Sequence, residues 1–219
     1  DEYFGGFITA AGEPVLWFMV FLGVTALVVL FGVEKGIEKV SKIMMPVLVV
    51  LTLFIALYSI FALEGAWKGV KYYITPDFSK FSATTVLAAM GQLFYSMSLA
   101  MGIMITYGSY MKKDVNLEKS VRQIEIFDTG IAFLAGLMII PSVFVFSGGD
   151  PAALGAGPGL MFMALPKVFA TMKMGTLIGA MFFILVFFAA LTSSISLMET
   201  VVSIVKDKTG LSRQKTLVI

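Results

Sequence analysis

Long runs without a charged side chain dominate the pattern of hydrophobic and polar positions along the chain. Each run reaches the roughly 20 apolar residues that a helix needs to cross about 30 Å of hydrocarbon. The runs do not show the alternating ten-residue segments of a transmembrane β-barrel, and lipid requires every backbone hydrogen bond to be satisfied internally. The pattern therefore predicts an all-α polytopic membrane helix bundle, a single transmembrane domain over residues 1–219, with spans at about 15–33, 43–63, 84–111, 122–146 and 174–205.

Composition supports a membrane protein. Hydrophobic residues make up 58% of the chain and charged residues 14%, against roughly 25% charged in ordinary soluble domains. The first apolar run lacks a basic segment before it and a small-residue cleavage site, so it does not resemble a signal peptide. The chain starts with Asp1 and holds an odd number of spans, from which we expect a piece of a larger protein.

The distribution of Lys and Arg predicts the orientation in the membrane. One set of connections and the C-terminal segment carry most of these residues: Lys35, Lys39, Lys42, Lys112, Lys113, Lys119, Arg122, Lys206, Lys208, Arg213 and Lys215. The opposite set holds Lys68, Lys71, Lys80, Lys167 and Lys173. Because basic residues concentrate on the cytoplasmic side, we expect a multi-pass protein of the cell (inner) membrane, with Asp1 outside, a long external loop at 147–173 and Ile219 in the cytoplasm.

Several kinds of chemistry are excluded by what the chain lacks. It contains no Cys and no His, which removes disulfides, thiol nucleophiles, imidazole proton transfer and the usual soft metal sites. There is no compelling pair of nucleophile and base, and the chain is not expected to be an enzyme. The net charge of +2 gives no reason to expect a nucleic-acid partner.

The segment GQLFYSMSLAMG, residues 91–102, is unusually polar for the middle of an apolar run. Its polar groups are either interhelical hydrogen-bonding groups or part of a helix that is interrupted around a ligand. Ser96 and Ser98 are two residues apart, so on a continuous helix they would point about 200° away from each other. An interruption would free backbone groups to bind an ion or a solute, as broken helices do in transporters. We therefore expect a broken helix at about 91–102.

A second polar cluster lies in FFAALTSSISLME, residues 187–199. Ser and Thr in membrane helices commonly bond a carbonyl of their own helix or a neighbouring helix, and that remains one interpretation. The other is an all-oxygen cation site, because the Ala189 carbonyl and the Thr192 and Ser193 hydroxyls fall at i, i+3 and i+4 on one helix face.

Two further pairs of residues each have a structural interpretation and a functional one. Asp128, with Glu125 one turn earlier, is either a carboxylate in the headgroup region or a charged group that faces a cavity or partner inside the membrane. Gly36 and Pro46 are either a helix start followed by a kink or a hinge, since proline removes a backbone hydrogen bond and glycine lowers the cost of unwinding.

Three segments resemble the neurotransmitter:sodium symporter family, in its bacterial amino-acid branch. They are GQLFYSMSLAMGIMITYGSY, IFDTGIAFLAGL and FFAALTSSISLME. The resemblance covers essentially the whole chain, which looks like transmembrane helices four to eight of that family and the beginning of helix nine. It implies part of an inverted-repeat sodium symporter fold, whose helices one to three and nine onward would be partners outside this chain.

The resemblance also implies roles for individual residues. Substrate-contacting positions would be Tyr95, Ser96, Ser98, Met101, Ser193 and Leu197. Sodium ligands would be Ser96 and Asp128 at one site, and Ala189, Thr192 and Ser193 at another. Gate positions would be Gln92, Tyr110 and Asp207, and the hinge would be Gly36 and Pro46. Ala100 stands where the family commonly has glycine in the break.

From this resemblance we expect a sodium-coupled secondary transporter that imports an amino acid, neutral or hydrophobic, with one or two Na⁺ ions and no organic cofactor. An acidic group near the first sodium site is a feature of chloride-independent members, and Asp128 would supply it. The alternative is a channel-like or scaffold helix bundle without coupled transport, although a channel needs a continuous polar stripe and the polar residues here cluster near the middle of the spans.

Overall fold

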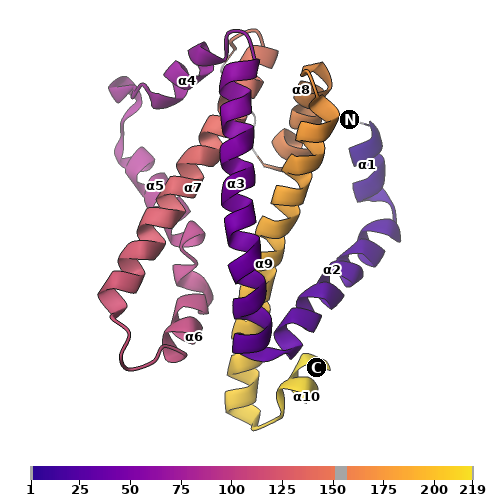
Figure 1. Ribbon diagram of the computed structural model, residues 1–219, viewed down its shortest axis with the longest axis vertical. Helices are drawn as coiled ribbons and strands as arrows, with labels where there is room; N and C mark the ends of the chain where they lie inside the picture. Colours follow the sequence, from indigo (N-terminus) through magenta and orange to yellow (C-terminus); the bar gives the residue numbers. More distant parts are fainter. Residues whose placement is uncertain (1, 151–156, 219) are drawn as a thin grey trace. The chain divides into compact units, whose positions relative to one another are not determined.

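A computed structural model describes residues 2–150 and 157–218, and every regular element within these residues is a helix (Figure 1). The predicted all-α fold class is confirmed. The α-helices are α1 (Glu2–Thr9), α2 (Glu13–Leu30), α3 (Lys39–Ala62), α4 (Ala66–Ile74), α5 (Ala83–Ser96), α6 (Ile103–Ser109), α7 (Leu117–Phe146), α8 (Leu165–Thr171), α9 (Gly175–Thr209) and α10 (Arg213–Val218). Shorter elements are the π-helices η1 (Val33–Glu38) and η5 (Leu160–Ala164) and the 3₁₀-helices η2 (Phe78–Lys80) and η3 (Leu99–Met101).

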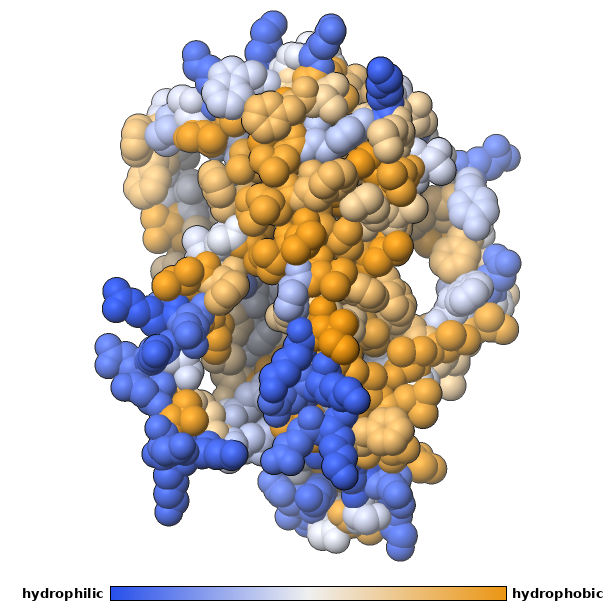
Figure 2. Space-filling model, in the orientation of Figure 1, coloured by the Kyte–Doolittle hydropathy of each residue, from blue (hydrophilic) through white to orange (hydrophobic). Residues whose placement is uncertain are grey.

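Four helical segments among the described residues are long and apolar enough to cross a membrane: Glu13–Leu30, Val33–Ala62, Leu117–Phe146 and Gly175–Thr209. The segment predicted as a span at 84–111 is instead divided into α5 and α6, which are 14 and 7 residues long. Apolar side chains cover much of the face seen in Figure 2, and large ones such as Trp17, Phe18 and Leu27 are exposed. A surface of this kind suits lipid or further helices, because soluble proteins rarely expose large apolar patches.

The connections between the long helices contain structure of their own. The predicted external loop at 147–173 includes η5 and α8, and its residues 151–156 lie outside the described part of the chain. In the connection before α5, Asp77 caps η2 by accepting a hydrogen bond from the Ser79 amide. Ser82 then accepts one from the Thr85 amide at the start of α5, which satisfies a helix N-terminal donor.

The chain forms two compact units, the first made of residues 1–17, 46–76 and 130–188. Within it, α4 lies close to the C-terminal half of α7. A Cβ at Gly69 would press on the backbone of Pro141, and one at Gly136 would collide with the Tyr73 ring, which stacks on Phe133. The two glycines therefore permit a helix approach that larger residues would prevent.

The second unit is made of residues 18–45, 77–129 and 189–219. Its buried residues include the apolar Val29, Ile103 and Ile195 together with polar and charged side chains: Thr25, Thr106, Glu199, Thr200 and Thr216. Buried polar groups are costly unless they are hydrogen-bonded. The buried polar and charged side chains therefore make the second unit the candidate location of a functional site.

The predicted hinge residues lie at the start of the second apolar span. Gly36 is buried in the π-helix η1, where a Cβ would collide with the carbonyl oxygen of Val28. Pro46 lies inside α3. A π-helix inside an α-helical segment is uncommon and often marks a functional site, and the hinge function of both residues stays a prediction.

Candidate functional site

The helix predicted to break at about 91–102 is interrupted within those residues. Helix α5 ends at Ser96, the backbone of Ser98 is left-handed with φ of 55°, and that of Gly102 is left-handed with φ of 74°. The single turn η3 lies between them, and α6 follows (Figure 1). Glycine adopts a positive φ readily, but a serine there carries strain of the kind that clusters at functional sites.

Ser96 lies at the end of α5 and contacts α7 directly. Its hydroxyl donates a hydrogen bond to Oδ1 of Asp128 at 2.6 Å. Hydrogen bonds to a carboxylate are shorter and stronger than those between neutral groups. The structure thus brings together a hydroxyl at the break and the carboxylate in the following long helix, the two residues that the family resemblance places at one sodium site.

The second set of predicted sodium ligands converges on one carbonyl oxygen in α9. The Thr192 hydroxyl donates to the Ala189 carbonyl at 3.0 Å, and the Ser193 hydroxyl donates to the same oxygen at 3.1 Å. Both bonds have the i−3 and i−4 form that Ser and Thr commonly make in membrane helices. Three oxygen atoms therefore lie together on one face of α9, which agrees with the spacing and leaves their role a prediction.

The remaining predicted substrate positions differ in exposure. Tyr95 and Leu197 are exposed, with relative surface areas of 67% and 44%, whereas Ser98 and Met101 are half-buried. Leu197 lies one turn beyond Ser193 on α9. These side chains have the surface available to contact a solute or further helices.

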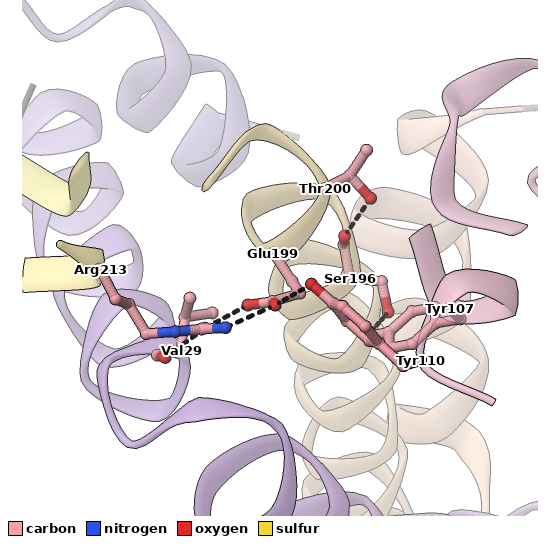
Figure 3. A network of polar contacts seen from close by, with 7 residues as sticks. All are labelled: Val29, Tyr107, Tyr110, Ser196, Glu199, Thr200 and Arg213. Carbon is pink, nitrogen blue, oxygen red and sulfur yellow. Dashed lines mark hydrogen bonds and ion pairs between the residues drawn. The ribbon is translucent and has the colours of Figure 1, made fainter. Parts of the chain in front are cut away.

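The predicted gate residues are divided between a network and the surface. Gln92 on α5 and Asp207 near the end of α9 are exposed. Tyr110 caps the C-terminus of α6 and donates a hydrogen bond to Oε1 of Glu199 at 2.7 Å. One turn away, Tyr107 and Ser196 are hydrogen-bonded at 3.1 Å. Two tyrosines three residues apart therefore connect α6 to α9 (Figure 3).

Glu199 is fully buried and forms an ion pair with Arg213 from α10. Arg213 Nη1 lies 2.5 Å from Oε2 of Glu199, and Nη2 lies 2.8 Å from Oε1. This bidentate geometry is the strong form of an arginine–carboxylate pair. The hydrogen bond to Glu199 holds the pKa of Arg213 above its ordinary value.

Arg213 also satisfies the end of α2. Its Nη1 donates to the carbonyl of Val29 at 3.0 Å, one residue before α2 ends (Figure 3). The last carbonyls of a helix have no partner within the helix, and positive charge is favourable at this end of the helix dipole. One guanidinium thus joins α10, α9 and the C-terminus of α2.

The sequence matches the model of the Sodium:neurotransmitter symporter family over residues 5–219. The chain belongs to this family. It is a family of transporters and not of enzymes, in agreement with the expectation from the sequence.

Relatives and a solved structure support the family assignment. The chain is 40% identical to the uncharacterized sodium-dependent transporter YhdH of Bacillus subtilis (strain 168), over 90% of this chain and 43% of that protein. It is 35% identical to an uncharacterized sodium-dependent transporter of Haemophilus influenzae, over 94% of this chain and 44% of that protein. It also resembles the crystal structure of MhsT in complex with L-phenylalanine, with a TM-score of 0.84, 39% identity and coverage of 99% of this chain and 48% of MhsT.

The chain of this symporter-family protein spans less than half the length of these relatives. The similarity to MhsT, at 39% sequence identity, confirms the predicted fold class.

Sequence reasoning did not single out the buried ion pair. From the sequence, Arg213 contributes only to the charge bias, and Glu199 is not recognised as a functional residue. One signal was available: Glu199 directly follows the uncharged run that ends at Met198, and a carboxylate at the end of such a run needs a partner. The position of that partner depends on the turn at Gly210, which has φ of 69° and separates α9 from α10.

Proposed function

We propose that this chain is part of a transporter that imports an amino acid together with one or two Na⁺ ions by alternating access. The observation that carries the proposal is the contact between Ser96 and Asp128 beside the helix break. A carboxylate and a hydroxyl at an unwound segment are suitable oxygen ligands for a hard cation. Irregular backbone in a membrane helix is tolerated where it lines a cavity or is covered by protein.

The first sodium site is assigned to Ser96 and Asp128, and the second to Ala189, Thr192 and Ser193. The second assignment is supported by the convergence of both hydroxyls on the Ala189 carbonyl. Both hydroxyls can keep their oxygen atoms turned toward a cation while their protons bond elsewhere. Further ligands would come from helices outside this chain.

The substrate is assigned to the class of neutral or hydrophobic amino acids. Tyr95, Ser98, Met101, Ser193 and Leu197 would surround it, and these side chains carry no charge. The related MhsT structure contains L-phenylalanine, which supports a hydrophobic substrate for the family branch. Backbone groups of the break would bind the polar end of the amino acid.

The network of Tyr110, Glu199 and Arg213 is assigned to the cytoplasmic side and would stabilise the state in which that side is closed. This follows from the orientation predicted by the Lys and Arg distribution, with Asp1 outside and Ile219 in the cytoplasm. Opening would require α6 to separate from α9, with loss of the hydrogen bonds at Tyr107 and Tyr110. Gly36 and Pro46 would act as a hinge, and Gln92 and Asp207 would belong to the outer and inner gates.

Site-directed variants of the full-length protein test these assignments in proteoliposomes. Sodium-dependent uptake of a panel of labelled amino acids is expected to fall at least tenfold in Ser96→Ala and in Thr192→Val, since a tenfold change corresponds to about 1.4 kcal/mol. Matched controls are Ser120→Ala on α7 and Thr209→Val on α9, whose hydroxyls bond their own helices away from both sites. Unchanged uptake in the first two variants would contradict the site assignment.

A further inference from the structure

Thr25 of α2 is completely buried, and its hydroxyl contacts Ser194 of α9. The two oxygen atoms are 3.1 Å apart, and the Thr25 hydroxyl donates to the Phe21 carbonyl at 3.0 Å. A hydroxyl has one proton to donate. Because the proton of Thr25 goes to Phe21, the Ser194 hydroxyl donates to Thr25, and the two helices are joined by a directional hydrogen bond.

Apolar residues surround this hydrogen bond on both helices. Val29, one turn after Thr25, is fully buried, and Leu191 and Ile195 beside Ser194 on α9 are 5% and 1% exposed. Thr25 itself is closed off from water, whereas Ser194 is half-buried. Loss of the Ser194 hydroxyl leaves Thr25 bonded to the Phe21 carbonyl, and loss of the Thr25 hydroxyl leaves Ser194 in a half-buried position. Either change therefore removes the link between the two helices without leaving a fully buried hydroxyl unsatisfied, which keeps the cost to stability small.

Ser194 directly follows the residues assigned to the second sodium site but points in another direction. On an α-helix with about 100° per residue, Ser194 lies roughly 140° around α9 from Ala189 and roughly 100° from Ser193. The contact with Thr25 is therefore on the opposite side of α9 from the oxygen cluster. It fixes the rotation of α9 about its own axis at the level where that cluster lies.

We propose that Thr25 is a positioning residue for the sodium site on α9, acting through Ser194. This inference rests on the proposed function, since it presupposes that Ala189, Thr192 and Ser193 bind Na⁺. Binding sites need their ligand groups held to within about 0.5 Å and 10–20°. Since further ligands would come from helices outside this chain, a larger rotation of α9 would turn its carbonyl and two hydroxyls together away from those ligands. The hydrogen bond on the far side of α9 therefore preserves the site without touching the ion.

The test uses the full-length protein in proteoliposomes and the sodium concentration that gives half-maximal amino acid uptake. In Thr25→Val, which keeps the shape and removes the hydroxyl, this concentration is expected to rise about fivefold, the change that corresponds to one typical hydrogen bond. Thr25→Ser keeps the hydroxyl and is expected to stay close to wild type. Ser194→Ala should give the same rise, and the double variant should be no worse than either single variant, because both remove one interaction.

Two further readouts separate positioning from general damage. The substrate KM at saturating sodium and the thermal unfolding temperature measured without sodium are expected to stay near wild type in Thr25→Val and Ser194→Ala. If KM, unfolding temperature and sodium dependence all change together, the positioning role is overturned. It is also overturned if either folded variant keeps the wild-type sodium dependence.

The outcome also distinguishes this inference from the proposed function. Wild-type uptake that does not depend on sodium would contradict the proposed function itself. Sodium-dependent wild-type uptake with no change in Thr25→Val or Ser194→Ala would contradict only the positioning role. If Thr25→Val does not fold, Ser194→Ala decides the question, because it removes the same bond from the half-buried side.

Discussion

The hydroxyl of Ser96 donates a hydrogen bond of 2.6 Å to the carboxylate of Asp128, although 32 residues separate them in sequence. Ser96 is the last residue of α5 before the break, and Asp128 lies three turns into α7. The bond therefore ties the point of interruption to an unbroken neighbouring helix. In the proposed transporter, the same two oxygen atoms would hold a Na⁺ ion beside the substrate.

Chloride independence is the first prediction from this relationship. The Asp128 carboxylate supplies a negative charge beside the proposed sodium site, so the protein would not need an anion to balance the cation. Uptake by the full-length protein should stay the same when chloride is replaced by gluconate at constant sodium. A requirement for chloride in wild type would contradict the role of Asp128, and Asp128→Asn provides the comparison without the charge.

Loss of Arg213 is expected to destabilise the protein strongly. Arg213→Ala leaves the fully buried Glu199 without its ion-pair partner, which costs about 3–5 kcal/mol when a buried pair is broken on one side. The measurement is thermal or denaturant unfolding of the full-length protein in detergent. Glu199→Gln combined with Arg213→Ala should recover part of the loss, because the charge is then absent as well.

The ion pair between Glu38 and Lys42 offers a matched control. Its atoms lie 2.6 Å apart, but the side chains are 50% and 73% exposed. Exposed pairs are screened by water and contribute little to stability, so Lys42→Ala should have little effect. Equal destabilisation by Lys42→Ala and Arg213→Ala would mean that burial of Glu199 does not govern the stability of the network.

Gly102→Ala is expected to disturb the second half of the broken helix. The φ of Gly102 is 74°, and an added Cβ would lie 3.2 Å from Cγ2 of Thr200. A non-glycine residue in this conformation costs about 1–3 kcal/mol. The variant should therefore lower the unfolding temperature and reduce uptake together.

Gly108→Ala on α6 is the control for that change. It has no heavy atom within 4 Å of an added Cβ and no positive φ. Alanine is favoured over glycine in a helix by about 0.5–1 kcal/mol, so this variant should be neutral or slightly more stable. A similar loss in both variants would show that α6 tolerates no alanine and that Gly102 has no special conformational role.

Gly36→Ala should disrupt the start of the second apolar span. An added Cβ would collide with the Val28 carbonyl, whereas one at Gly23 on α2 would meet nothing within 4 Å. We expect Gly36→Ala to destabilise the protein by about 1–3 kcal/mol, because overpacking of a close contact has a cost of this size. Gly23→Ala is expected to be neutral. Unfolding of both variants in detergent measures the difference, and equal stability would contradict the close approach of η1 to α2.

The long apolar helices and the break could be predicted because they depend on local composition. A run of apolar residues needs no knowledge of its neighbours to indicate a membrane helix, and the Gly, Gln and Ser residues of 91–102 mark the interruption within one such run. The convergence of Thr192 and Ser193 on Ala189 follows from helical spacing alone. These features required only the periodicity of one helix.

The pairs that join different helices could not be predicted in the same way. Thr25 and Ser194 are 169 residues apart, and Glu199 meets Arg213 only because the chain turns after α9. No local pattern specifies which hydroxyl of the segment 192–196 faces a neighbouring helix. Packing decides that choice, and it also decides that Tyr110 bonds Glu199 while Asp207 stays exposed.

Sodium-driven accumulation of an amino acid tests directly whether the full-length protein couples transport to Na⁺. The full-length protein is reconstituted in proteoliposomes, and uptake of labelled L-phenylalanine and other neutral amino acids is followed under an inward Na⁺ gradient or an equal K⁺ gradient. We expect transient accumulation of an amino acid above its external concentration with Na⁺ and none with K⁺. Equal uptake with both cations, or equilibration without accumulation for every amino acid tested, would contradict this expectation.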